Sequence, residues 1–168
     1  MIDKISEEKF EKLIYDNQAL IIKICNIYCN TQEDRDDLFQ DITINLWKGI
    51  DSFRGDSKLS TWIYKVSLNT AISRFRKKSK LKIVDIDQIH DLKADSHEDK
   101  FENELRIKAL YTGIGKLKPV EKALILLYLE EKSYDEIAQI IGISTKNVSV
   151  KLVRIKKKLE KIITSSMN

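Results

Sequence analysis

A chain of 168 residues that contains only one proline and five glycines has few places where its backbone can turn sharply. A β protein needs such residues between its many short strands, whereas helices need them mainly at their ends. Lysine, isoleucine and leucine are the commonest residues, and lysine and leucine are strong helix formers. The sequence therefore predicts an all-α fold.

Charge is distributed unevenly along the chain. Residues 1–80 carry a net charge of +2, residues 81–105 a net charge of −5, and residues 106–168 a net charge of +7. Between residues 81 and 100 no helical period of apolar residues is sustained. We therefore expect two small helical domains, 1–80 and 101–168, joined by an acidic flexible linker at 81–100.

The first domain is predicted to contain four helices. The expected ranges are a short helix at 9–14, a second at 17–29, a third from about 31 to 48, and a fourth from 60 to about 78. Asn30 and Thr31 can cap the third helix, whose acidic first turn suits the helix dipole. Gly49 and Gly55 indicate a loop at 49–57.

The second domain has the pattern of a helix-turn-helix between Ser133 and Leu159. Ser133 and Glu136 form a capping box, Gly142 permits the turn, and Ser144 can cap the last helix. Ile137, Ala138 and Ile141 are expected to form the buried face of the helix before the turn. In the helix after the turn an apolar stripe is expected to be buried: Val148, Leu152, Ile155 and Leu159. An outward face that is mostly polar and basic is typical of a helix that enters the major groove of DNA, although an ordinary helical hairpin with a solvated lysine-rich face has the same pattern.

The segment from Lys58 to Lys80 joins an aromatic and hydroxyl-rich start, Ser60 to Trp62, to a strongly basic end without acids after Thr70. Aromatic rings can stack on unpaired bases and basic side chains can bind phosphates. Taken alone, the segment slightly favours a simpler interpretation, a surface helix with Trp62 in the core and a basic end that complements the helix dipole.

Several classes of function lack support in the sequence. Cys25 and Cys29 are the only cysteines, and they lie in an apolar helical segment that predicts two buried thiols. No phosphate-binding glycine loop, catalytic triad or zinc motif is present. We expect no catalytic residue, no metal, no cofactor and no small-molecule substrate. No apolar run approaches a membrane span of roughly 20 residues, and the charged start is unlike a signal peptide, so we expect a cytoplasmic protein.

Three segments resemble sigma factors of bacterial RNA polymerase, in the extracytoplasmic-function group of the sigma-70 family. Residues 34–47, DRDDLFQDITINLW, resemble the acidic helix that docks on polymerase. Residues 53–78, FRGDSKLSTWIYKVSLNTAISRFRKK, resemble the region that recognises the −10 element and melts DNA. Residues 117–159 resemble the domain that recognises the −35 element. The order and spacing of the three segments make this combination more specific than any one of them.

The resemblance implies roles for individual residues. For binding core polymerase it implies Asp37, Gln40 and Asp41. For −10 recognition and melting it implies Phe53, Arg54, Lys58, Ser60, Thr61, Trp62, Lys65, Arg74 and Arg76. For −35 recognition it implies Thr145, Lys146, Asn147, Ser149, Val150, Lys151 and Arg154. Ser149 and Val150 depart from the residues common in relatives, and Val150 could contact a thymine methyl group.

The expected function is therefore that of a sigma factor whose partners are core RNA polymerase, promoter DNA and an anti-sigma factor. The acidic linker could occupy a polymerase channel that normally holds nucleic acid, or it could be a solvated connection. Two rival interpretations remain at this stage. A helix-turn-helix regulator that does not join polymerase would explain only the C-terminal domain. An adaptor that binds only proteins would show no salt-dependent affinity for DNA.

Overall fold

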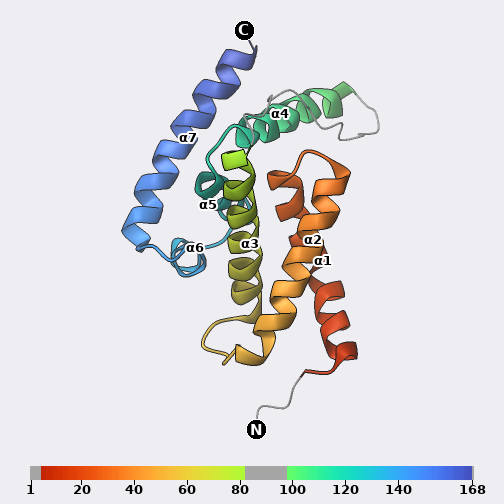
Figure 1. Ribbon diagram of the computed structural model, residues 1–168. Coiled ribbons are helices and arrows are strands. Elements are labelled where there is room, and N and C mark those ends of the chain that lie inside the picture. Colours follow the sequence, from red (N-terminus) through yellow and green to blue (C-terminus); the bar gives the residue numbers. More distant parts are fainter. Residues whose placement is uncertain (1–4, 82–97, 168) are drawn as a thin grey trace. The chain divides into compact units, whose positions relative to one another are not determined.

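The computed structural model describes residues 5–81 and 98–167, with side chains described for 5–78 and 101–166. Within these residues the chain forms seven α-helices and one short 3-10 helix, and no strand. The helices form two compact units (Figure 1). Helices α1 to α3 belong to the first, and α4, α5, most of α6 and α7 belong to the second. The predicted all-α fold is confirmed, and most of the predicted linker, 82–97, lies outside the described residues.

The first unit is a bundle of three long helices in which each contacts the other two. They are α1 (Glu7–Tyr28), α2 (Gln32–Gly49) and α3 (Leu59–Leu81), with the 3-10 helix η1 (Ile50–Ser52) after α2. Thr31 caps α2 as predicted, because its side chain accepts a hydrogen bond from the amide of Asp34. In Figure 1, α3 runs lengthwise beside α2.

The prediction of two separate helices before residue 30 was wrong, because α1 is continuous. The expected break fell at Tyr15 and Asp16, just before Asn17, and aspartate and asparagine are weak helix formers. The Asn17 side chain instead donates a hydrogen bond of 2.8 Å to the carbonyl of Leu13, one turn earlier. No glycine or proline interrupts the segment, so the apolar residues before and after Asn17 can share one helix.

The core of the first unit is formed by the apolar stripes of its three helices. The largest fully buried side chains are Ile21, Ile24, Leu38, Ile42, Leu46, Ile63 and Leu68, each at most 1% exposed. In α2, Leu38, Ile42 and Leu46 recur every four residues and form its buried side. Burial of this stripe leaves the acidic residues of α2 on its other sides.

The second unit consists of α4 (Glu98–Gly115), α5 (Pro119–Leu129), α6 (Tyr134–Ile141) and α7 (Thr145–Met167). Both halves of the predicted capping box are present at Ser133, and Gly142 ends α6 with φ of 80° and ψ of 36°. Ser144 accepts a hydrogen bond of 3.2 Å from the amide of Asn147. These local signals place α6 and α7 in the predicted helix-turn-helix order.

Packing in the helix-turn-helix differs from the prediction in one helix. All four residues of the stripe predicted on α7 are at most 5% exposed. On α6, Ile137 is fully buried as predicted, but Ile140 is the second buried residue, while Ala138 and Ile141 are only half-buried. In a helix of eight residues the apolar pattern does not determine which apolar residues are the most buried, because residues three and four apart both lie near the same face.

Candidate nucleic-acid interface

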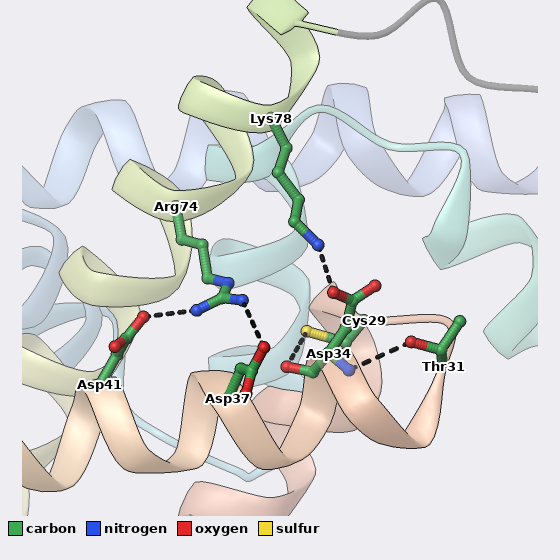
Figure 2. A network of polar contacts seen from close by, with 7 residues as sticks. All are labelled: Cys29, Thr31, Asp34, Asp37, Asp41, Arg74 and Lys78. Atoms are coloured by element: carbon green, nitrogen blue, oxygen red, sulfur yellow. Dashed lines mark hydrogen bonds and ion pairs between the residues drawn. The ribbon is translucent and has the colours of Figure 1, made fainter.

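Three carboxylates of α2 face two basic side chains of α3, and together they form a cluster that we call the acid–base ladder: Asp34, Asp37, Asp41, Arg74 and Lys78. Arg74 lies between two of the acids, with Nη1 2.5 Å from Oδ2 of Asp41 and Nη2 3.4 Å from Oδ2 of Asp37 (Figure 2). Lys78 pairs with Asp34. The structure therefore brings predicted polymerase-binding acids together with a predicted DNA-binding arginine.

Local bonds hold the start of this ladder in place. The Asp34 amide donates to Thr31, and the Asp34 carbonyl lies 3.5 Å from the thiol of Cys29 (Figure 2). The hydrogen bond from Lys78 is the main cause that holds the pKa of the Asp34 carboxyl below its ordinary value. Further along the two helices, Asn45 donates a hydrogen bond of 2.9 Å to Thr70.

Arg74 remains charged although its side chain is partly shielded from solvent. Burial alone would lower its pKa, but the hydrogen bond to Asp41 and the nearby charges of Asp41 and Asp37 outweigh burial, so the pKa is raised. The Arg74 side chain is 23% exposed, while those of Asp37 and Asp41 are 53% and 47% exposed. Gln40, the third predicted polymerase-binding residue, is exposed on the same helix.

A second cluster, the Trp62 corner, forms where the start of α3 meets the segment after α2. The rings of Trp62 and Phe53 lie 5.5 Å apart between centroids, at an angle of 45°. A Cβ at Gly49 would lie 3.1 Å from Cζ2 of Trp62, so the indole packs closely against the end of α2. Trp62 is nevertheless only half-buried. It therefore belongs partly to the core and keeps an accessible part.

The other residues predicted for −10 recognition differ in exposure. Arg54, Lys58, Lys65 and Arg76 are exposed, and Ser60 is half-buried. Thr61 is 8% exposed, beside the buried Ile63 and Tyr64. A buried threonine side chain cannot read a base edge in this conformation, whereas the exposed cations can reach a phosphate backbone.

The predicted outer face of α7 is open. Thr145, Lys146, Asn147, Val150, Lys151 and Arg154 are exposed, and Ser149 is half-buried. The Thr145 hydroxyl donates 2.9 Å to the carboxylate of Asp135 and thereby ties α7 to α6. Sequence reasoning missed Val153, which is 51% exposed beside Val150 at 41%. Its position three residues after Val150 was the available signal, since residues three apart share a helix face.

Two lysines of α7 bind within the second unit. Lys158 forms an ion pair of 2.9 Å with Glu121 at the start of α5, and Nζ of Lys156 lies 3.9 Å above the ring of Tyr128. The carboxyl of Glu121 would have its pKa raised by burial, but hydrogen bonds from the Lys118 amide and from Lys158 lower it overall. The basic side chains of α7 therefore divide into an outer set and a set that holds α5.

Comparison with known proteins decides the family. Residues 13–81 match sigma-70 region 2, and residues 107–159 match sigma-70 region 4. The chain is 33% identical over 138 residues to the RNA polymerase sigma factor YlaC of Bacillus subtilis, covering 80% of each protein. This protein belongs to the sigma-70 family.

A further relative agrees with that assignment, and a solved structure has a similar fold. The sigma factor SigV of Bacillus subtilis is 26% identical over 142 residues, which cover 84% of this chain and 82% of the relative. The fold is similar to that of the sigma factor RpoE from Bartonella quintana, solved in complex with the anti-sigma factor NepR. The TM-score is 0.72 at 18% identity, over 94% of this chain and 98% of the other.

The two family regions of this sigma factor coincide with its structural clusters. The region 2 match covers most of α1 and all of α2 and α3, and so includes the acid–base ladder and the Trp62 corner. The region 4 match covers the helix-turn-helix. Within the residues that the structure describes, no group of acids, histidines and cysteines could hold a metal ion, and no helix is long and apolar enough to cross a membrane.

Proposed function

We propose that this sigma factor binds core RNA polymerase and directs it to promoters by contacts with both the −10 and the −35 elements. The carrying observation is that one chain contains both sigma-70 regions, in order, each with its own exposed polar surface. A regulator that binds duplex DNA alone needs the helix-turn-helix but has no use for region 2. The protein itself then acts as an initiation factor and not as a catalyst.

For polymerase binding we propose the exposed side of α2 with Asp37, Gln40 and Asp41. The two carboxylates retain about half of their side-chain exposure despite their contacts with Arg74. Carboxylates that are solvated but oriented suit a basic partner surface, because complementary charge speeds encounter and selects the partner.

For the −10 element we propose that the Trp62 corner receives an unpaired base. The accessible part of Trp62, with Phe53 at its side, offers an aromatic surface, and Ser60 lies close by in sequence. Exposed cations can contact the strand on either side: Arg54, Lys58, Lys65 and Arg76. Stacking of an extruded base can offset an unstacking cost of a few kcal/mol. Thr61 would need a local rearrangement to take part.

For the −35 element we propose that α7 enters the major groove with its outer face. Lys146, Lys151 and Arg154 supply phosphate or guanine contacts, and Thr145, Asn147 and Ser149 supply further hydrogen-bonding groups. Val150 and Val153 form an exposed apolar pair on a basic helix. Such a pair suits thymine methyl groups, so thymines are expected opposite this part of α7.

We also propose regulation by an anti-sigma factor and action in the cytoplasm, where promoter DNA is found. The structure of RpoE from Bartonella quintana was solved with the anti-sigma factor NepR, which supports this type of partner for a chain of the same fold.

Run-off transcription tests the proposal. Core polymerase is supplied with genomic fragments, with and without the full-length protein, and the starts of transcripts are mapped. The expected result is a set of new starts that share upstream elements, together with co-purification of protein and core enzyme. Duplex binding by the protein without any capture of core polymerase would instead establish the regulator. The variant Trp62→Ala should reduce opening of the −10 region, detected with permanganate, more than capture of polymerase.

A further inference from the structure

The basic side chains of α3 occupy two different edges of that helix. Lys65 and Arg76 lie on exposed parts of its surface. Arg74 and Lys78, four residues apart and therefore on one edge, face the carboxylates of α2. Although the sequence of α3 presents one basic segment, the fold divides it, and the edge with Arg74 and Lys78 lies against the carboxylates of α2.

The edge that faces α2 is a poor place for a phosphate. It contains three carboxylates against two cations, so its local charge is negative. Nε of Arg74 is buried and has no hydrogen-bond partner among the described residues, so the guanidinium is inserted into the seam between the helices. To reach DNA, Arg74 would have to leave two ion pairs and carry a phosphate toward two unpaired carboxylates.

The same geometry suits another task. Asp37 and Asp41 are one helical turn apart, and two like charges at that spacing repel each other. Arg74 contacts Oδ2 of each, which fixes both side chains and leaves the other oxygen of each carboxylate outside the Arg74 contacts. The planar fork of an arginine can bridge two acids in this way, whereas a lysine is a single point charge.

We infer that Arg74 is a positioning residue for polymerase binding: it holds Asp37 and Asp41 in the orientation that a basic surface of the core enzyme meets, and it does not contact promoter phosphates. This inference rests on the proposed function of the α2 face. Fixing the two side chains before binding avoids the entropy cost of immobilising them on the partner.

Removing Arg74 has two opposed effects on polymerase binding. The α2 face becomes more negative, which strengthens its long-range attraction to a basic partner. At physiological ionic strength, however, salt largely screens attraction between charges that are more than about 8 Å apart. The loss of fixed orientation of Asp37 and Asp41 weakens their direct contacts with polymerase, and salt does not screen this effect. We therefore expect Arg74→Gln to weaken affinity for core polymerase on the order of tenfold, mainly through faster dissociation.

The test compares variants of the full-length protein in two assays. One assay measures affinity for purified core polymerase, and the other measures binding of a labelled single-stranded oligonucleotide. Lys77→Gln is the matched control, because it removes one positive charge from an exposed site three residues away on α3. Lys65→Gln is the positive control for loss of DNA binding. Circular dichroism checks that each variant is folded.

The expected result is that Arg74→Gln loses polymerase affinity and keeps oligonucleotide binding, while Lys77→Gln keeps polymerase affinity. Arg74→Lys should recover only part of the loss, and it replaces Arg74→Gln in the comparison if the glutamine variant does not fold. In the background of Asp37→Asn with Asp41→Asn, Arg74→Gln should have little further effect.

Three outcomes would overturn the inference. One is normal polymerase affinity of Arg74→Gln together with a loss of DNA binding as large as that of Lys65→Gln. Another is full recovery by Arg74→Lys, which would mean that charge alone suffices. The third is an undiminished effect of Arg74→Gln when both aspartates are already replaced. If the unmodified protein itself fails to bind core polymerase, it is the proposed function that fails, before any variant is compared.

Discussion

Arg74 shows how much one side chain can change the interpretation of a segment. In the sequence it is one of several basic residues near the end of α3, and the family resemblance assigns it to DNA. In the fold its partners are Asp37 and Asp41, which are 37 and 33 residues away. No local pattern links residues so far apart, because which carboxylate meets which cation depends on the register of α3 against α2.

Cys25 and Cys29 provide a prediction about reactivity. Burial raises the pKa of the Cys25 thiol to about 12 and that of the Cys29 thiol to about 11. Because the thiolate is the reactive form, neither thiol should react with iodoacetamide in the folded protein at pH 8, and both should react after unfolding in urea. Mass spectrometry would count the modified sites, and rapid labelling of the folded protein would contradict the burial.

The same shifts predict a dependence of stability on pH. With the native pKa above the ordinary value of 9.0, the unfolded chain releases thiol protons first as pH rises. The stabilisation is complete below pH 9 and is lost as pH rises through the two native values. Unfolding in urea at several alkaline pH values, compared with the Cys25→Ala and Cys29→Ala double variant, would measure this contribution. It should be present in the unmodified protein and absent from the variant.

At the scale of elements, the turn of the helix-turn-helix depends on Gly142. Its φ of 80° lies in the left-handed region, where a side chain costs about 1–2 kcal/mol. Gly142→Ala should therefore lower the free energy of unfolding by about that amount, measured by urea denaturation. Gly142→Asn is the matched control and should cost less, since asparagine tolerates this conformation. Equal stability of all three proteins would contradict the role of the turn.

Elements were predictable where their ends carry chemical signals. The caps at Thr31, Ser133 and Ser144 and the turn at Gly142 were all recognised in the sequence and are present in the structure. The interior of α1 was not predictable in this way: the expected break at Tyr15 and Asp16, just before Asn17, is absent from the continuous helix. A tertiary core on both sides of these residues overrides a propensity difference of well under 1 kcal/mol each.

At the scale of the whole molecule, the charge of residues 106–168, a net +7, predicts salt-dependent binding to duplex DNA. If Arg154 contacts a phosphate, Arg154→Gln should reduce the slope of a plot of the logarithm of the DNA-binding constant against the logarithm of the salt concentration by about 1. Lys156→Gln is the matched control on the same helix, because Nζ of Lys156 lies over the ring of Tyr128. Titration of a promoter duplex at several salt concentrations would measure both slopes. Equal reductions in the two variants would contradict the division of the α7 cations.

The sequence by itself determined the helical class and the helix-turn-helix, because composition, periodicity, caps and glycines act within a few residues of one another. The family follows from the similarity of whole segments to known sigma factors, which also needs only the sequence. The sequence also identified the polar residues of α2, α3 and α7 as candidates. Only the tertiary structure decided which of these candidates remain accessible to a binding partner. Thr61 is buried, Trp62 is shared between core and surface, and Arg74 pairs with acids of another helix, since burial and ion pairing depend on how distant segments pack.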